Sequence, residues 1–181
     1  GVRIINEDQR VINNYFVDLA GEGTHAALCF MNGIPNSPAF GYDQVKRALV
    51  AFNTAVHCRE NIVIGYISAT RQEPILAPQD CTFANNLIVS TTGPLVRIMT
   101  VPSGIAWSGN ILFGAESGLP GGAGVIVSDP KLMRAADGLW RPAPGSPALA
   151  AAAGDYPFVT TDIDGQPRPA GKDIGCDQQS A

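Results

Sequence analysis

The chain has 181 residues, of which 45% are hydrophobic, enough to build one domain around an ordinary core. Its net charge of −4 gives no basic field for nucleic acid, and no apolar run approaches the length of a membrane span. Charged residues make up only 15% of the chain, while 20 glycines and 14 prolines favour many turns over long helices. The composition therefore predicts an all-β or solenoid domain that uses neither nucleic acid nor membrane as a partner.

One pattern recurs along the chain, in which apolar residues precede an asparagine and further apolar residues follow it. The key asparagines of the four copies are Asn14, Asn53, Asn86 and Asn110. Asparagine tolerates left-handed backbone, and its side chain can hydrogen-bond to an equivalent asparagine in the next repeat. Each copy thus predicts a strand, an asparagine corner and a second strand. The alternative is four unrelated asparagine turns.

Apolar segments between these copies supply further strand candidates, at residues 2–5, 26–31, 61–67 and 94–101. Residues 43–56 also fit a helix, because Val45, Leu49 and Phe52 recur at helical spacing. Alignment with the other copies favours strands there. Together the repeats predict a right-handed parallel β-helix.

Insertions rich in proline and glycine separate the expected coils, at residues 32–42, 70–80 and 114–124. Loops on one side of a solenoid usually form its binding face. The repeat pattern ends near residue 130, where an Ala/Pro-rich stretch and a polar tail begin. We therefore expect β-helix coils at 1–129 and a C-terminal capping segment at 130–181.

The four cysteines lack the close spacing of a zinc or redox site. Two interpretations stay open. All four can be buried thiols, or two can form a disulfide, in which case Cys58 with Cys81 is the favoured pair because they flank successive strand units.

Four segments resemble the family-6 polysaccharide lyases, which include alginate lyases and chondroitinase B. They are residues 1–16 (GVRIINEDQRVINNYF), 31–38 (MNGIPNSP), 41–46 (GYDQVK) and 162–177. The resemblance runs through nearly the whole chain and implies a right-handed parallel β-helix. It also implies β-elimination on a uronate-containing polysaccharide, a reaction that must neutralise a carboxylate, remove the adjacent proton and support the leaving oxygen.

The family performs this reaction with calcium, a lysine base and an arginine, whose motifs are absent from this chain. The resemblance therefore implies the C-terminal half of such a lyase, with no catalytic residue and no metal ligand of its own. We expect an N-terminal β-helix half or another chain to cover the first coil, residues 1–16. Secretion or a periplasmic location is expected for such an enzyme, although Gly1 is not preceded by a signal peptide here.

Arg3 matches an arginine on the family's substrate face, where a guanidinium can hold a uronate carboxylate through two hydrogen bonds. The alternative is a surface arginine in a loose ion pair with Glu7 or Asp8. The same motif departs from the family at Asn6, where glycine is usual, and at Gln9, where histidine is usual.

Three further residues are candidates for substrate binding: Tyr42, Lys46 and Arg71. Alternation in a strand would put Tyr42, Gln44 and Lys46 on one face, so that a ring and a cation face the sugar. Arg47 would then point the opposite way and be structural. Arg71 lies in an insertion and could contact an anionic sugar.

The remaining candidates favour structural roles. His25 and His57 have no metal-ligand spacing, so a packed or solvated role is expected for both. Asp162-Ile-Asp-Gly resembles part of a calcium loop, but no glutamate follows at the required distance, which favours a capping turn.

Three functions remain after these observations. The leading one is a lyase segment that supplies substrate subsites for alginate or a related uronate polysaccharide. A non-catalytic carbohydrate-binding β-helix and a structural fragment are the alternatives.

Overall fold

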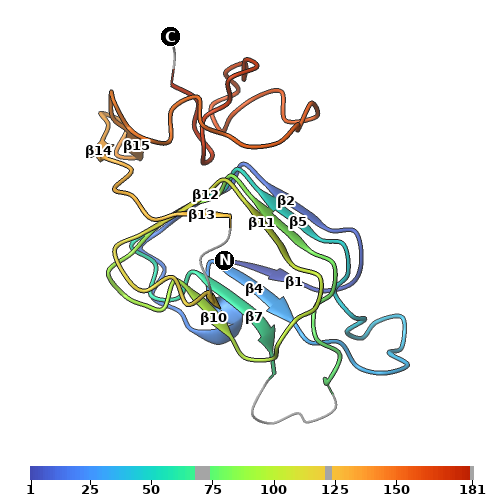
Figure 1. Ribbon diagram of the computed structural model, residues 1–181. Coiled ribbons are helices and arrows are strands. Elements are labelled where there is room, and N and C mark those ends of the chain that lie inside the picture. The colour runs from blue at the N-terminus through green and yellow to red at the C-terminus, as the bar shows by residue number, and fades with distance from the viewer. Residues whose placement is uncertain (68–73, 121–123, 180–181) are drawn as a thin grey trace.

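The computed structural model describes residues 1–67, 74–120 and 124–179, and its regular structure consists almost entirely of short strands. The chain winds so that each coil gives one strand to each of three parallel sheets (Figure 1). No helix in these ranges is long and apolar enough to cross a membrane. The predicted fold class, an all-β parallel β-helix, is confirmed.

The first sheet has the order β1 (Val2–Ile4), β4 (Leu28–Met31), β7 (Ile62–Tyr66) and β10 (Val96–Ile98). The second sheet contains β2 (Arg10–Ile12), β5 (Leu49–Ala51), β8 (Thr82–Ala84) and β11 (Ala106–Ser108). The third sheet contains β3 (Tyr15–Val17), β6 (Thr54–Val56), β9 (Leu87–Val89), β12 (Asn110–Phe113) and β13 (Val125–Ile126). A 3-10 turn, η1 (Gly23–His25), and an antiparallel hairpin, β14 (Leu132–Arg134) with β15 (Trp140–Pro142), complete the elements.

The predicted asparagine ladder is present at the corner between the second and third sheets. The side-chain nitrogen of Asn53 donates to the Oδ1 of Asn86 at 2.9 Å, and the nitrogen of Asn86 donates to the Oδ1 of Asn110 at 2.8 Å. Asn14 donates to Asn53 in the same way, at 2.9 Å. Each Oδ1 also accepts the backbone N–H of the asparagine above it, so stacking satisfies groups that the corner would otherwise bury unpaired.

The residue before each ladder asparagine has the left-handed backbone that turns the corner. Asn13, Phe52, Asn85 and Gly109 have φ angles of 57°, 54°, 54° and 64°. This bend separates β5 from β6, so residues 43–56 cannot continue as one helix and the helical alternative is wrong. A strand period and a corner override the helical spacing of the apolar residues.

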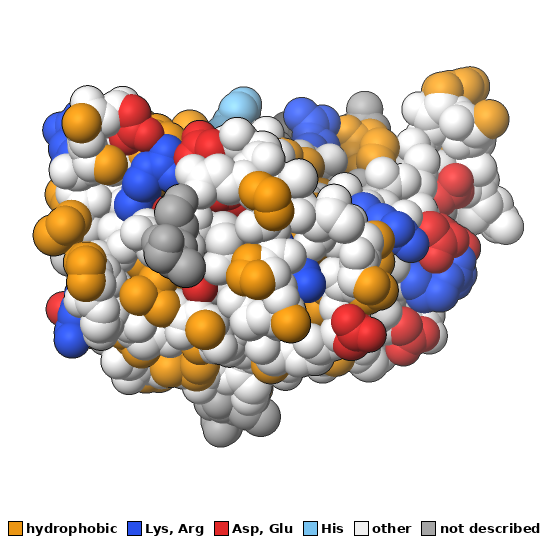
Figure 2. Space-filling view, turned by 90° about the horizontal axis from the view of Figure 1, so that it is seen from above, with side chains coloured by type: hydrophobic (Ala, Val, Ile, Leu, Met, Phe, Trp, Pro, Cys, Tyr) orange, Lys and Arg blue, Asp and Glu red, His pale blue; other side chains and the backbone are white. Residues whose placement is uncertain are grey.

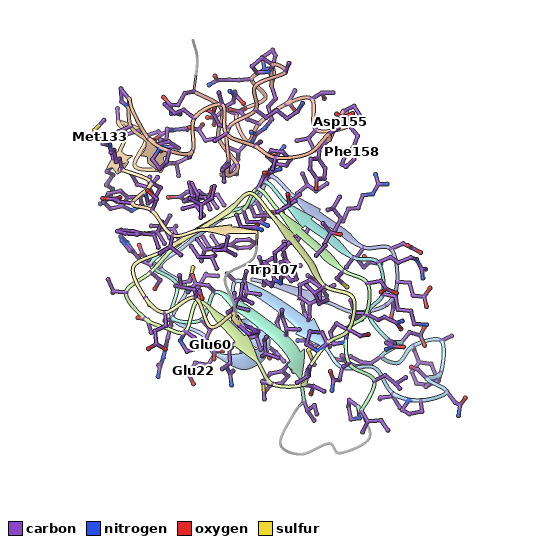
Figure 3. All side chains as sticks on the ribbon, in the orientation of Figure 1. Glu22, Glu60, Trp107, Met133, Asp155 and Phe158 are labelled. Atoms are coloured by element: carbon purple, nitrogen blue, oxygen red, sulfur yellow. The ribbon has the colours of Figure 1, made fainter. Side chains whose placement is uncertain are left out.

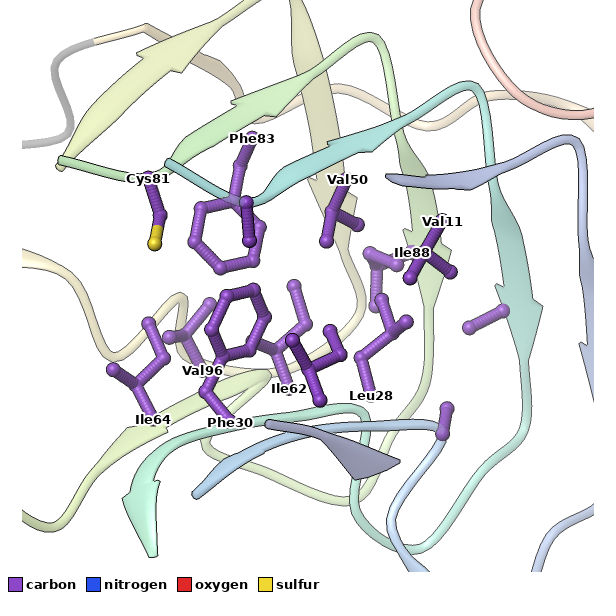
Figure 4. Close-up of a cluster of buried hydrophobic side chains, with 14 of the residues drawn as sticks. Val11, Leu28, Phe30, Val50, Ile62, Ile64, Cys81, Phe83, Ile88 and Val96 are labelled. Carbon is purple, nitrogen blue, oxygen red and sulfur yellow. The ribbon is translucent and has the colours of Figure 1, made fainter. Parts of the chain in front are cut away.

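The core lies inside the coils, where inward side chains of all three sheets meet (Figure 4). Alternation places Leu28 and Phe30 inward and Cys29 outward along β4. The Phe30 and Phe83 rings lie 5.0 Å apart between their centroids, and Phe83 stacks on Trp107 at 4.2 Å. Stacked aromatic rings thus continue the core from coil to coil.

All four cysteines are buried free thiols, so the proposed Cys58–Cys81 disulfide is wrong. Cys58 and Cys81 both belong to the apolar core, where they pack as small hydrophobic side chains. Burial raises the pKa of each thiol, and that of Cys29 reaches about 12. These thiols are therefore protonated at neutral pH.

Residues 130–179, predicted as a cap, run along the outside of the coils at the asparagine corner (Figure 1). Asn13 donates to the carbonyl of Thr161, Asn85 exchanges two hydrogen bonds with Ala153, and Thr54 accepts the N–H of Cys176. Two small apolar clusters join this segment to the second and third sheets. The segment therefore contacts several coils at once.

Candidate functional site

Arg3 stands on the outer face of the first sheet, because its neighbours Val2 and Ile4 pack on the core. Its Nη1 donates a 2.8 Å hydrogen bond to the hydroxyl of Tyr42, a residue of the predicted site. The Tyr42 ring packs against the cluster of Cys29, Met31 and Val63 on the same outer face. The fold thus brings Arg3 and Tyr42 together, with the guanidinium held by an aromatic hydroxyl and still exposed.

The carboxylates of Glu7 and Asp8 are engaged by other cations than Arg3. Lys46 pairs with Glu7 at 3.1 Å, and Arg47 contacts both Glu7 at 2.5 Å and Asp8 at 2.8 Å. The alternative, a loose ion pair of Arg3 with Glu7 or Asp8, is therefore wrong. Among the described residues, no carboxylate pairs with the guanidinium of Arg3.

Lys46 reaches this region from the irregular segment before β5. Residues 42–45 form no strand, and Lys46 makes only isolated parallel bridges to Glu7 and Gln79, so the expected strand face of Tyr42, Gln44 and Lys46 is wrong. This irregular segment follows the insertion after β4, and pairing with the neighbouring coils resumes at Lys46. Lys46 instead lines a depression of about 290 Å³ together with Glu7, Asp43 and Gln44.

Arg47 pairs with the carboxylates of Glu7 and Asp8, but it shares Glu7 with Lys46 and so does not point away from Lys46 as expected. Its backbone is left-handed, with φ of 53°, like Asp8 and Asp80 at the same corner of neighbouring coils. Hydrogen bonds from Arg47 and then from Lys46 hold the pKa of Glu7 below its usual value, and Arg47 lowers the pKa of Asp8. The corner is thus lined by side chains of alternating charge.

The two departures from the family motif have local explanations. Asn6 has a φ of 70°, a left-handed conformation in which glycine is common and asparagine is tolerated. Asn6 therefore preserves the backbone that glycine would allow. Gln9 is exposed and donates to the carbonyl of Glu7, 3.2 Å away.

Of the remaining candidates, the structure describes only the two histidines, whose partners are neither Arg3 nor Tyr42. Arg71 falls outside the described residues. His57 pairs with Asp18 at 3.7 Å and meets the Trp140 ring edge-on, while His25 is exposed beside Thr24. These surroundings agree with packed or solvated histidines.

The C-terminal segment contains a group of acidic residues with the spacing of a possible cation site. Oxygens of Asp162, Asp164 and Asp177 all lie within 4.8 Å of one another, the one such group among the described residues. Arg141 already contacts Asp164 at 2.7 Å and also Asp177. The Asp162 oxygens accept backbone N–H groups of Asp164, Gln166 and Gln178, as in the predicted turn. A cation would have to displace Arg141, so these residues do not fit the family's calcium ion.

Sequence reasoning missed Arg97, the second arginine on the outer face of the first sheet. The parallel register aligns Arg3 with Cys29, Cys29 with Val63, and Val63 with Arg97. Arg97 pairs with Glu60 at 2.6 Å. The alternation of apolar residues in the predicted strand at 94–101 could have placed Arg97 outward, but its alignment with Arg3 required the register.

Comparisons with known proteins agree with this architecture. The family model described as chondroitinase B matches residues 1–149. Two solved structures of a PL6 family alginate lyase named AlyGC, one of them an arginine-to-alanine mutant, superpose with TM-scores of 0.70 and 0.69 at 33% identity. A comparison with curated protein sequences found no match.

Each superposition covers 78% of this chain but only 19% of the alginate lyase chain, so the sequence spans about a fifth of the length of the proteins it resembles. The family match covers all of the coils and the start of the C-terminal segment. The chain belongs to the chondroitinase B family and has the fold of the PL6 polysaccharide lyases.

Proposed function

We propose that this chain is part of a polysaccharide lyase that cleaves alginate or a related uronate polysaccharide by calcium-assisted β-elimination. In this proposal the chain supplies substrate-binding subsites. The lysine base, the arginine and the calcium ligands lie in a preceding β-helix half or in another chain that continues the coils beyond β1, β2 and β3. Such an enzyme meets its polymer after secretion or export to the periplasm.

The observation that carries the proposal is the exposed guanidinium of Arg3, which Tyr42 holds on the outer face of the first sheet and which no carboxylate of the described residues pairs with. A guanidinium can bind a carboxylate through two parallel hydrogen bonds, and the Tyr42 ring offers an apolar surface to a sugar. The chain has a net charge of −4, so an acidic polymer needs such a local cation to bind. Lys46 would contact the polymer from the neighbouring depression, where Glu7 already pairs with its ammonium group.

Titration of the purified chain with oligouronates prepared from alginate tests this role. We expect binding that weakens with salt, and Arg3→Ala should lower the affinity by about tenfold or more, because a charge-assisted hydrogen bond contributes roughly 1.5–3 kcal/mol. Arg3 is exposed, so its replacement leaves the fold intact, and Arg134→Ala on the exposed β14 is a matched control. Unchanged affinity and salt response in Arg3→Ala would show a solvated surface charge only.

A second measurement addresses catalysis. Incubation of the chain with alginate should release no unsaturated sugar ends, which absorb in the ultraviolet, with or without calcium. Calcium-dependent turnover by the chain alone would contradict the assignment of catalysis to another segment, and Lys46, Tyr42 and His57 would then be tested as the base.

A further inference from the structure

A hollow of about 570 Å³ lies at the opposite edge of the first sheet from Arg3. It is lined by six residues from the loop that contains η1, from β7 and β10, and from the positions directly after these two strands: Glu22, Gly23, Tyr66, Ile67, Arg97 and Met99. Arg97 occupies the same row as Arg3, three strands further along the sheet. At the usual strand spacing the two arginines are about 14 Å apart. The hollow is thus on the same outer face as the proposed Arg3 subsite and separate from it.

The side chains of this hollow are held in place by their neighbours. Glu60 is only 17% exposed, pairs with Arg97 at 2.6 Å and accepts the N–H of Gly23 with its other oxygen. Glu22 and Glu60 lie together beside β10 in Figure 3, and Arg59 contacts Glu22 at 2.5 Å. Glu60 therefore connects the η1 loop to the guanidinium that faces the hollow.

The Tyr66 ring is fixed by the approach of Gly23. A β-carbon at Gly23 would lie 2.6 Å from the ring, and the φ of Gly23 is +60°, so only glycine lets the loop approach so closely. The ring also packs on the cluster of Cys29, Met31 and Val63. Tyr66 thus presents a positioned aromatic side chain to the hollow.

We propose that this hollow is a second subsite for an acidic sugar, and that it binds a more distant residue of the same oligouronate that Arg3 holds. The proposal rests on the proposed function. Tyr66 would stack on the sugar ring, the guanidinium of Arg97 would donate to the carboxylate, and Glu22 would accept from a hydroxyl. Glu60 acts as a positioning residue for Arg97.

The balance of positive and negative side chains around the hollow predicts which oligouronates it binds. Glu22 and Glu60 offset the charges of Arg59 and Arg97, so the hollow attracts anions less strongly at long range than Arg3, which no carboxylate of the described residues pairs with. The hollow contributes to affinity through stacking and through hydrogen bonds that form only once the sugar is in contact with it. It therefore extends the binding of a chain already held at Arg3 and raises affinity only for ligands long enough to reach both sites.

Calorimetric titration with short and long oligouronates from alginate tests the second subsite. Wild type should bind the long ligand more tightly than the short one. Arg97→Ala should abolish this gain, with a loss of about tenfold, equivalent to about 1.4 kcal/mol. Met99→Glu provides an independent test, because Met99 is 42% exposed and a carboxylate there repels the ligand without disturbing the core. Arg134→Ala should retain the gain.

The outcomes separate this inference from the proposed function. If Arg3→Ala weakens binding while Arg97→Ala and Met99→Glu keep the full gain with ligand length, the second subsite does not exist and the Arg3 site stands. If wild type binds no oligouronate, both proposals fail. Equal gains from a neutral oligosaccharide of the same length would overturn the acidic specificity. Thermal unfolding of each variant shows whether a loss reflects misfolding, and Met99→Glu decides the case if Arg97→Ala is destabilised.

Discussion

The coils and the C-terminal segment are held together in different ways. In the coils the same contact recurs at the same position, as in the ladder from Asn14 to Asn110. In residues 130–179 each contact occurs once, and two arginines make many of them. Arg141 contacts Asp137, Asp164 and Asp177, while Arg168 donates to the carbonyls of Asp173 and Gly175. Repetition thus stabilises the coils, whereas a few polar anchors hold the segment on their flank.

The surface of the C-terminal segment reflects its attachment through a few polar contacts. Viewed from above in Figure 2, basic and acidic side chains adjoin one another and hydrophobic side chains are scattered between them. Burial raises the pKa of Asp177, and Arg141 opposes this effect. The segment therefore depends on charge pairing at particular points, which single substitutions can remove.

The largest expected effect comes from the middle of the ladder. Asn86→Ala removes the acceptor of two Asn53 N–H groups and the donors to Val50 and Asn110, all in a buried site. Each unsatisfied buried group costs about 1–3 kcal/mol, so the free energy of unfolding should fall by at least about 3 kcal/mol in urea denaturation.

Asn14→Ala is the matched control for that experiment. Asn14 stands at one end of the ladder and is only partly buried, so its replacement should cost about 1 kcal/mol. Equal losses for Asn14→Ala and Asn86→Ala would mean that the ladder is not a cooperative unit.

A smaller and more local effect is expected for Arg168→Met. The guanidinium donates to Asn13, Asp173 and Gly175 and lies 4.9 Å from the centroid of the Phe52 ring. Its removal should loosen residues 130–179 before the coils unfold, at a cost of about 2–3 kcal/mol in that segment. Limited proteolysis should then cut the segment first and leave the coils intact. Cleavage within the coils at the same rate would show that residues 130–179 are not anchored separately from the coils. Arg134→Met on exposed β14 removes one positive charge without these contacts and is the control.

The smallest effect is expected at the charged corner of the coils. The pKa values of Glu7 and Asp8 are lowered in the folded chain, so their pairing with Arg47 stabilises it above the ordinary carboxyl pKa of about 4. This contribution is lost as the pH falls through the lowered values. The melting temperature of Arg47→Gln should therefore lie slightly below that of wild type at neutral pH and match it in acid below the lowered pKa values. A difference that persists in acid or in high salt would exclude an ionic origin.

The contrast between recurring local patterns and contacts that occur only once also explains which parts of the site could be predicted. Arg3, Tyr42 and Lys46 were recognised as candidates by motif, and the structure brings Arg3 to Tyr42 across 39 positions of sequence. The strand face expected for Tyr42 and Lys46 failed because the preceding insertion changes the local backbone, which alternation cannot detect. Arg97 was missed because its relation to Arg3 exists only through the register of four paired strands.

The sequence alone determined the repeating part of the molecule, since each asparagine corner and each alternating strand is a local signal that recurs along the chain. Only the tertiary structure decided that the four cysteines are unpaired thiols, that residues 130–179 lie along the flank of the coils, and that Arg141 occupies the acidic group near Asp162. These features depend on contacts between residues far apart in sequence. Packing and strand register select such contacts, and no local pattern specifies them in advance.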